Sequence, residues 1–254
     1  MSVSGERDGV TPVALRGALA LFTDATASPS GLTDQGLADV AGRAVARRFG
    51  SSVPVLYARQ RHGRLAYVYS SAEPLPAGPH LVGECDVLIT GEVGVVLTVR
   101  TADCLPIAFA APGVVAMVHA GWRGLAADVL DSALARLANE FGAGAASVEA
   151  AIGVGVGPCH YPVGAEVIDG LATVGGDGAW HADGRVDLAA WTVGRLRALG
   201  VGMGQVRVLP GCTACSPSYH SFRRDGATAG RQWSAIVLTD GLRHSTPDSA
   251  IRCT

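Results

Sequence analysis

The apolar and polar residues of this chain follow two alternating rhythms. Residues 32–49 repeat apolar side chains every three or four positions, which predicts an amphipathic helix. Short apolar runs rich in valine, leucine and isoleucine predict strands. We expect helices over 32–49, 125–141 and 187–199, and strands over 54–58, 66–69, 86–90, 94–99, 114–118, 151–157, 205–209 and 233–238. Because strands alternate with helices, the pattern indicates an α/β fold. Residues 24–31 and the last ten residues follow neither rhythm, and we expect them to pack most loosely.

Composition narrows the class of protein. The 254 residues are 48% hydrophobic with no long polar stretch between them, so we expect one domain over residues 1–254. A net charge of −2 argues against a broad surface for nucleic acid or anionic membrane. The chain contains no lysine, which excludes Schiff-base chemistry and a P-loop lysine.

Hydrophobicity also bears on location. No apolar run approaches the roughly 20 residues of a membrane span, and the first residues lack the apolar core of a signal peptide. We therefore expect a cytoplasmic protein whose six cysteines are free thiols or metal ligands rather than disulfides. The pattern makes no prediction of the oligomeric state.

Three potential metal ligands stand at predicted strand or turn ends. His62 follows one strand, while Cys104 and His119 bracket a predicted strand pair and could face each other across it. Two imidazoles and one thiolate would leave the fourth position of a tetrahedral zinc ion for water or substrate. The spacing of these three residues along the chain is equally compatible with buried histidine and cysteine side chains that bind no metal.

Other motifs are weaker or absent. Cys212 and Cys215 form a lone C-x-x-C pair, which without a second pair is weak evidence for zinc or redox chemistry. The nucleobase-deaminase signature fails because Pro162 stands where its last cysteine belongs. The glycine-rich stretch 151–157 lacks the third glycine of a dinucleotide-binding loop and is better explained by close backbone packing. No Gly-x-Ser-x-Gly elbow indicates a serine hydrolase.

Arginine side chains are the candidate anion ligands. Arg223 and Arg224 could clamp phosphate through bidentate hydrogen bonds, or form a solvated pair beside Asp225. Arg123 follows Trp122, where it could stack on the indole or contact substrate.

Six short segments together resemble the YfiH-like family, once described as laccase-domain or multicopper polyphenol oxidases and now as purine nucleoside phosphorylases. They are Gln60-Arg61-His62-Gly63, Thr101-Ala102-Asp103-Cys104-Leu105-Pro106, Val118-His119-Ala120-Gly121-Trp122-Arg123-Gly124, Gly157-Pro158-Cys159, Cys212-Thr213 and Ser221-Phe222-Arg223-Arg224-Asp225. Their order and spacing match over about residues 50–235. The Ala-Asp-Cys and His-Ala-Gly-Trp-Arg-Gly segments are the most specific.

The resemblance implies a single mixed-sheet α/β domain of the cytotoxic-necrotizing-factor-like type. It also implies one zinc ion held by His62, Cys104 and His119. The implied reactions are phosphorolysis of adenosine, inosine, guanosine or methylthioadenosine, and deamination of adenosine. Some bacterial members are described as editing factors in peptidoglycan synthesis. In this reading Arg223 and Arg224 position phosphate, and Asp103 orients a metal ligand, moves a proton or serves as a structural acceptor.

This chain departs from the family pattern at three places. The N-terminal loop is short, spanning only residues 22–31, whereas the family has a longer glycine-rich loop with an arginine. His160 and Pro162 replace a cysteine and a glutamate, and Arg61 stands where valine is usual. The first two departures remove or exchange polar groups expected near the pocket, so the substrate range of this chain could differ from that of the family.

Three rival readings remain. Cys104 could be the nucleophile of a cysteine hydrolase with His119 as base, acting on an amide or a peptidoglycan precursor. Copper could occupy the His2Cys trio, although seven histidines without an H-x-H pair do not suit a multicopper oxidase. Zinc could also have a purely structural role, stabilising the fold of a protein without catalytic activity.

Overall fold

The structure is a computed structural model that describes residues 8–71, 74–176 and 178–239. Cys253 and the last ten residues, which we expected to pack loosely, lie outside the described residues. The described strands form two six-stranded sheets and a small hairpin. The first sheet has the order β1 (Val10–Leu15), β2 (Ala18–Thr23), β14 (Gln232–Leu238), β7 (Val96–Thr101), β3 (Pro54–Arg59) and β5 (Gly78–Glu84). The second has the order β13 (Val206–Val208), β10 (Glu149–Ile152), β8 (Leu105–Ala111), β9 (Val114–Ala120), β6 (Val87–Thr90) and β4 (Ala66–Tyr69). The hairpin pairs β11 (His181–Ala182) with β12 (Arg185–Val186).

Both large sheets are mixed. Strand β3 is parallel to β5 and β7, β4 is parallel to β6 and β10 is parallel to β13, while the other neighbours are antiparallel. The helices are α1 (Asp34–Phe49), α2 (Trp122–Ala126), α3 (Val129–Phe141), α4 (Ala165–Val174), α5 (Leu188–Ala198) and α6 (Phe222–Asp225). The predicted mixed-sheet α/β fold is confirmed. None of the helices described is both long and apolar enough for a membrane crossing.

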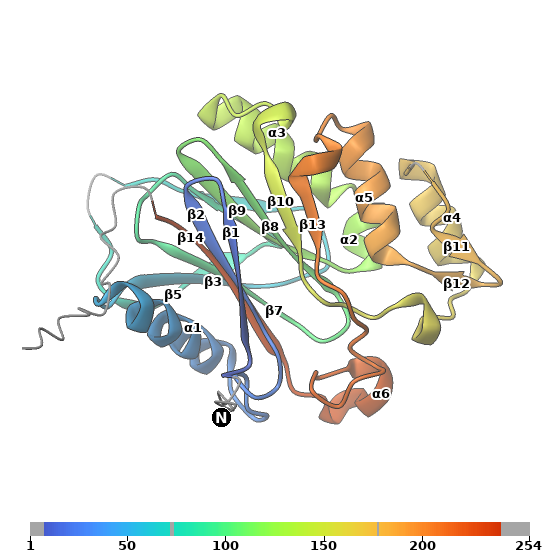
Figure 1. Ribbon diagram of the computed structural model, residues 1–254, viewed down its shortest axis with the longest axis horizontal. Helices are drawn as coiled ribbons and strands as arrows, with labels where there is room; N and C mark the ends of the chain where they lie inside the picture. Colours follow the sequence, from blue (N-terminus) through green and yellow to red (C-terminus); the bar gives the residue numbers. More distant parts are fainter. Residues whose placement is uncertain (1–7, 72–73, 177, 240–254) are drawn as a thin grey trace, which may run out of the picture.

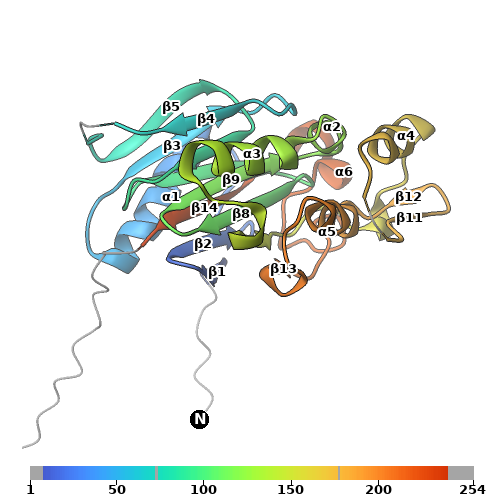
Figure 2. The ribbon, with the colours of Figure 1, turned by 90° about the horizontal axis from the view of Figure 1, so that it is seen from above.

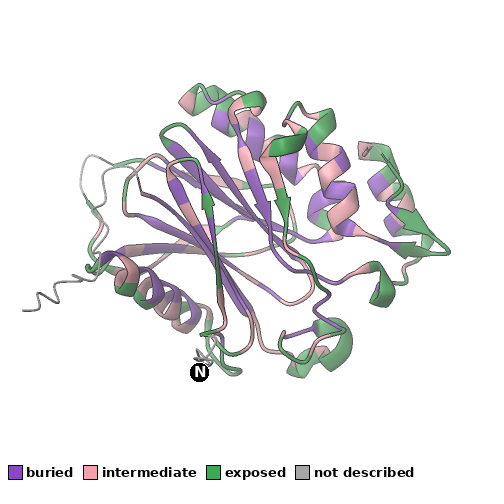
Figure 3. Cartoon of the chain, in the orientation of Figure 1, coloured by how far each residue is buried: buried purple, intermediate pink, exposed green. Residues whose placement is uncertain are grey.

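The side chains of β9 show how the layers pack. Val115 and Met117 join the apolar cluster between the two sheets, whereas Val114 and Val118 point to the opposite face and join the cluster under α2–α5. A third cluster packs α1 against the outer face of the first sheet. Because strand side chains alternate between faces, every position of β9 is buried. Figures 1 and 2 show the resulting order of layers, with α1 on one side of the sheets and α3 and α5 on the other, and Figure 3 shows the buried strands between them.

Two predicted elements are shorter than the pattern indicated. The expected helix 125–141 is interrupted, because Asp128 adopts a left-handed conformation (φ 61°) and its carboxylate accepts hydrogen bonds from the Arg195 guanidinium. The expected strand 151–157 ends at Ile152. A Cβ atom on Gly153 would lie 2.4 Å from Phe22, and one on Gly155 2.6 Å from Leu105, so these glycines serve close packing.

The segment 24–31, which we expected to be loose, is anchored. Ser28 is fully buried. Its hydroxyl lies 3.0 Å from Thr23 Oγ1 and accepts a hydrogen bond from the backbone N–H of Trp233. The pattern also missed β1, β2, β5 and β8. Strand β8 contains Pro106, a residue that is unusual inside a sheet, whereas the equally buried β9 was predicted from its apolar run. The anchored segment and β8 bear on function, since they border the site described next.

Candidate active site

Two histidines and a cysteine meet where strands from both sheets end. His62 follows β3, Cys104 directly precedes β8, and His119 lies in β9 opposite Pro106. Their ligand atoms all lie within 4.8 Å of one another, and the two imidazole rings meet edge to face. The structure therefore brings together the three residues that the sequence singled out.

The buried carboxylate of Asp86 organises this trio. It is 1% exposed and lies 2.8 Å from His119 Nδ1. It also accepts hydrogen bonds from the backbone N–H groups of Arg61, His62 and Gly63. A His119 ring that donates from Nδ1 to a carboxylate presents Nε2 to a metal. Asp86 thus fixes one ring directly and the backbone of the second histidine, which adopts a left-handed conformation (φ 59°).

The space around the trio is kept open by a glycine. A Cβ atom on Gly121 would lie 2.8 Å from Cys104 Sγ and 3.2 Å from His62 Cδ2. Because φ of Gly121 is −85°, the backbone itself would accept any residue. The need for glycine here is therefore one of space beside the two donors.

The electrostatics suit a thiolate ligand. Burial raises the pKa of the Cys104 thiol, but hydrogen bonds from His119 and His62 outweigh that effect and lower the pKa to about 6. Burial lowers the pKa of His119, while its hydrogen bonds to Asp86 and Cys104 raise the pKa to about 9. A soft thiolate beside two imidazoles is a donor set that zinc and copper both accept.

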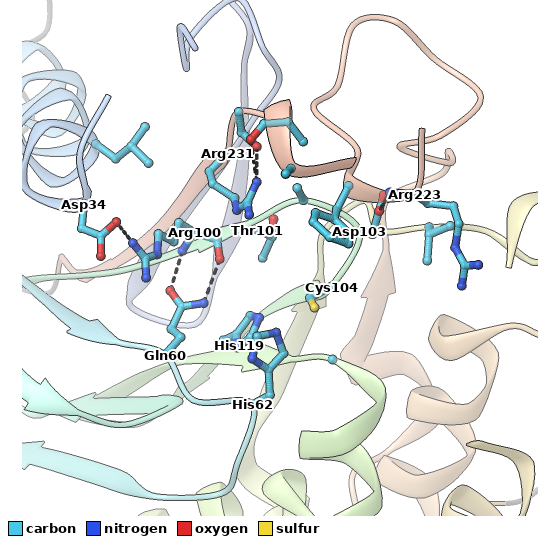
Figure 4. A pocket seen from close by; sticks show the side chains of 18 of the residues that line it. Asp34, Gln60, His62, Arg100, Thr101, Asp103, Cys104, His119, Arg223 and Arg231 are labelled. Carbon is cyan, nitrogen blue, oxygen red and sulfur yellow. Dashed lines mark hydrogen bonds and ion pairs between the residues drawn. The ribbon is translucent and has the colours of Figure 1, made fainter. Parts of the chain in front are cut away.

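A pocket of about 1060 Å³ opens over the trio. It is lined by His62, Cys104 and His119, by Pro29 and residues 31–34, and by residues of α6 and the loop after it. The predicted residues Asp103, Arg123 and Arg223 also line it. Figure 4 shows the trio facing this pocket.

The predicted arginines have different surroundings. Arg123 stacks on Trp122 with its guanidinium carbon 4.4 Å from the ring centroid, and Arg223 lies 5.1 Å above the Tyr161 ring. Arg224 does not line the pocket. Its guanidinium donates hydrogen bonds to the carbonyl oxygens of residues 213, 216 and 219 and to the side chain of Asp225. The expected phosphate clamp of two adjacent arginines is therefore not formed, because Arg224 is committed to the loop before α6.

Asp103 serves as an acceptor in the wall of the pocket. One carboxylate oxygen accepts hydrogen bonds from the hydroxyls of Thr213 and Ser221, and the other accepts one from the backbone N–H of Arg223. Of the roles considered from sequence, this geometry matches the structural acceptor. The carboxylate that orients a histidine of the trio is instead Asp86, which lies 2.8 Å from His119 Nδ1.

Sequence reasoning missed two further arginines. Arg100, at the end of β7, and Arg231, just before β14, both line the pocket. The pKa of Arg100 is lowered by burial and by the nearby charge of Arg231. Arg100 pairs with Asp34, and the Gln60 side-chain amide donates to the Arg100 carbonyl oxygen and accepts from the Arg100 backbone N–H. In Figure 4 these two arginines lie on one side of the trio and Arg223 on the other.

Few sequence signals identify the pocket and trio residues that the sequence analysis missed. Gln60 belongs to the quoted Gln-x-His-Gly segment, and Asp86 is a charged residue at the start of a buried strand, which is an unusual position for a carboxylate. Arg100 and Arg231 carry no motif, since only the pairing of β7 with β14 brings their ends together.

The sequence model of the family described as "multi-copper polyphenol oxidoreductase laccase" matches residues 38–239. The chain belongs to this laccase family. The matched range contains the trio, Asp86 and the four pocket arginines. Within the family, the chain is 33% identical over 158 residues to a purine nucleoside phosphorylase of Deinococcus radiodurans. That match covers 61% of this chain and 62% of the relative, so about two fifths of each lies outside it.

Other relatives of this laccase family carry the same name. A purine nucleoside phosphorylase of Clostridium acetobutylicum is 30% identical over 71% of this chain and 75% of its own length. The purine nucleoside phosphorylase YfiH of Shigella flexneri is 35% identical over 65% of this chain and 68% of its own length. The resemblance to the YfiH-like family is thus confirmed.

Solved structures agree in fold. The YfiH protein of Bacillus licheniformis has a TM-score of 0.76 and 25% identity, covering 87% of this chain and 92% of that one. YlmD of Geobacillus stearothermophilus has a TM-score of 0.71 and 27% identity with the same coverage. The two mixed sheets are therefore the architecture of known members.

Proposed function

We propose that this protein is a metal-dependent purine nucleoside phosphorylase, with zinc held by His62, Cys104 and His119. The observation that carries the proposal is that this three-ligand set faces a large pocket that also presents several arginines. The names of its relatives in the laccase family support the same reaction. We expect adenosine, inosine, guanosine and methylthioadenosine as the substrate class.

The trio fits a catalytic zinc ion. Catalytic zinc sites use three protein ligands and keep one position for water or substrate. The ring nitrogen of a ligating histidine that does not face the metal commonly donates to a carboxylate. Asp86 provides that carboxylate, and Gly121 leaves room beside the donors. When bound, zinc would supply Lewis acidity toward a substrate oxygen or nitrogen.

We assign phosphate binding to Arg100 and Arg231, which lie on one side of the trio, and we assign Arg223 to the base on the other side. Arg100 and Arg231 are close enough for one charge to lower the pKa of the other guanidinium, and a dianion between them would relieve this repulsion. Guanidinium groups bind phosphate oxygens in a planar, bidentate manner. Arg224 is omitted because its donors are engaged with the loop before α6.

The opposite side of the pocket suits a purine base. Tyr161, Trp122 and the 54%-exposed Phe222 line it, and aromatic rings stack on the faces of bases. Arg223 above Tyr161 and Arg123 above Trp122 hold these rings in place or extend the stacking surface. The base and the phosphate would then lie on different sides of the ribose.

In the proposed reaction, a phosphate oxygen forms a bond to C1′ of the ribose as the C1′–N9 bond breaks. The bonding electron pair leaves with the purine, which takes up a proton from solvent, and ribose 1-phosphate remains. Positive charge develops on the ribose as in glycoside cleavage. The arginines would hold the anionic phosphate against that charge.

The test is product analysis with adenosine, with and without phosphate. We expect phosphate-dependent release of adenine, and loss of both bound zinc and turnover in Cys104→Ala. Arg231→Ala should raise the KM for phosphate, whereas Arg224→Ala should leave that KM unchanged and lower Tm by a few degrees. Phosphate-independent formation of inosine would instead indicate deamination.

Three results would overturn the proposal. Alkylation of Cys104 by iodoacetamide in the zinc-loaded protein, with turnover of an amide or a peptidoglycan precursor, would establish the cysteine hydrolase. Phenol oxidation after copper loading would establish the oxidase. Bound zinc without turnover of any purine nucleoside would favour a structural metal.

A further inference from the structure

A second group of metal-ligating side chains lies apart from the trio. Cys159, His160, Cys212 and Cys215 each offer one ligand atom, and these four atoms lie within 4.8 Å of one another. Cys159 Sγ is 3.3 Å from Cys215 Sγ, which in turn is 3.1 Å from His160 Nδ1. Three of the four residues are exposed, and Cys212 is buried. None of them lines the pocket over the trio.

The group is assembled from two loops distant in sequence. Cys159 and His160 lie in the short 3-10 helix Pro158–His160 after β10, and Cys212 and Cys215 lie in the loop before α6. The lone C-x-x-C pair therefore gains two further donors that sequence spacing could not reveal. Three exposed thiol or imidazole groups converging on one point have no apolar packing role to explain them.

We propose that Cys159, His160, Cys212 and Cys215 form a second, structural zinc site. A Cys3His set of four protein ligands is a typical closed tetrahedral zinc site, with no position left for substrate. At Zn–S bonds of about 2.3 Å, two sulfurs of one tetrahedron lie about 3.8 Å apart, which is close to the spacing found here. A disulfide between Cys159 and Cys215 would use only half of this donor set.

The surroundings of the four residues match a ligand shell that carries negative charge. The Gly157 N–H donates a hydrogen bond to Cys212 Sγ, at a distance of 3.1 Å. A Cβ atom on Gly157 would lie 3.1 Å from Cys212 Cβ, so glycine allows the first loop to approach Cys212 closely. The Arg185 guanidinium donates to the carbonyl oxygen of Cys159. Three thiolates and a zinc ion carry a net charge of −1, which these donors would favour.

The second site would connect two walls of the pocket. Residue 161, which directly follows the first loop, lines the pocket. On the second loop, Thr213 lies between the two cysteines and donates its hydroxyl to Asp103, which also binds the backbone of Arg223. Arg224 closes that loop through carbonyls on both sides of Cys215. Zinc here would therefore fix the position of the pocket wall without touching substrate.

The experiment measures bound zinc per chain in the full-length protein purified with zinc. We expect two zinc ions in the wild type and one in Cys215→Ser and in His160→Ala, both changes being at exposed positions. His181→Ala removes an exposed histidine outside both groups, and it should keep two ions. Cys104→Ala should lose the other ion, which separates this proposal from the proposed activity.

A second measurement uses the unaltered protein and does not depend on variants that fold. With zinc bound, iodoacetamide should leave the exposed Cys159 and Cys215 unmodified, and removal of zinc by a chelator should open both to alkylation; Cys212 is buried and does not serve as a readout. Alkylation of Cys159 and Cys215 at the same rate with and without zinc would overturn the proposal. So would a Cys159–Cys215 disulfide, recognised because a reductant and not a chelator releases it, or one zinc ion in the wild type that Cys215→Ser retains.

Discussion

Replacing Asp86 by asparagine removes the negative charge that holds His62 and His119 in place, with almost no change in shape. The carboxylate serves four donors: His119 Nδ1 at 2.8 Å and the backbone N–H groups of residues 61, 62 and 63. An asparagine oxygen can still accept from His119, but its amide nitrogen must then face the Gly63 N–H, which donates 2.8 Å away to the other oxygen. This half-buried donor loses its acceptor and meets another donor.

The expected cost follows from these contacts. A buried donor left without a partner costs about 1–3 kcal/mol, and loss of charge assistance to His119 adds about 1 kcal/mol. We therefore expect Asp86→Asn to reduce the free energy of unfolding by about 2–4 kcal/mol. For a chain of this length that corresponds to a fall in Tm of about 5–15 °C. Since the change also weakens the hydrogen bond that orients the His119 ring, zinc affinity should fall about 10–100-fold.

Thermal denaturation and competition with a chromophoric chelator measure the two effects. The chelator titration is best made in the Cys215→Ser background, so that only zinc bound at His62, Cys104 and His119 contributes. Asp187→Asn is the matched control, because Asp187 caps α5 through the Ala190 N–H and asparagine caps a helix equally well. Wild-type zinc affinity and Tm in Asp86→Asn would refute the assignment of Asp86 as the group that positions His119.

Three further predictions concern the pocket. Arg231→Ala should raise the KM for phosphate about 10–100-fold while the KM for nucleoside changes little, because charge-assisted hydrogen bonds to an anion are worth about 1.5–3 kcal/mol; an unchanged phosphate dependence in steady-state kinetics would refute this role. In zinc-stripped protein, alkylation of Cys104 should accelerate as the pH rises through about 6, since its lowered pKa makes the thiolate the main form above that pH. Burial and the neighbouring carboxylate raise the pKa of Cys85 to about 12, so Cys85 should stay unmodified at pH 8 in the same mass spectrum. Gly121→Ala should weaken zinc binding at least tenfold, because the added methyl would lie 2.8 Å from Cys104 Sγ, whereas Gly144→Ala, where a Cβ meets nothing within 4 Å, should leave it unchanged.

The missed features of the fold share one cause. Strand β8 contains Pro106, which is unusual inside a sheet, and only its pairing with β9 and β10 identifies it as an inner strand. The break at Asp128 depends on Arg195, which lies 67 positions away. The packing of Ser28 depends equally on Trp233 from the other end of the chain. Local periodicity carries no information on contacts of this kind.

The sequence by itself determined the elements whose chemistry is local. The 3.6-residue period of residues 34–49, the Asp187 cap and the apolar run that ends in His119 all specify structure within a few residues of themselves. The tertiary structure decided which polar groups share a site. Pairing of β8 with β9 brings Cys104 close to His119, and a carboxylate that no motif marks, Asp86, orients the His119 ring. Two loops separated by about 50 residues bring three further thiols and an imidazole together. Metal and anion sites need donors within a few ångströms in space, and only the folded chain sets those distances.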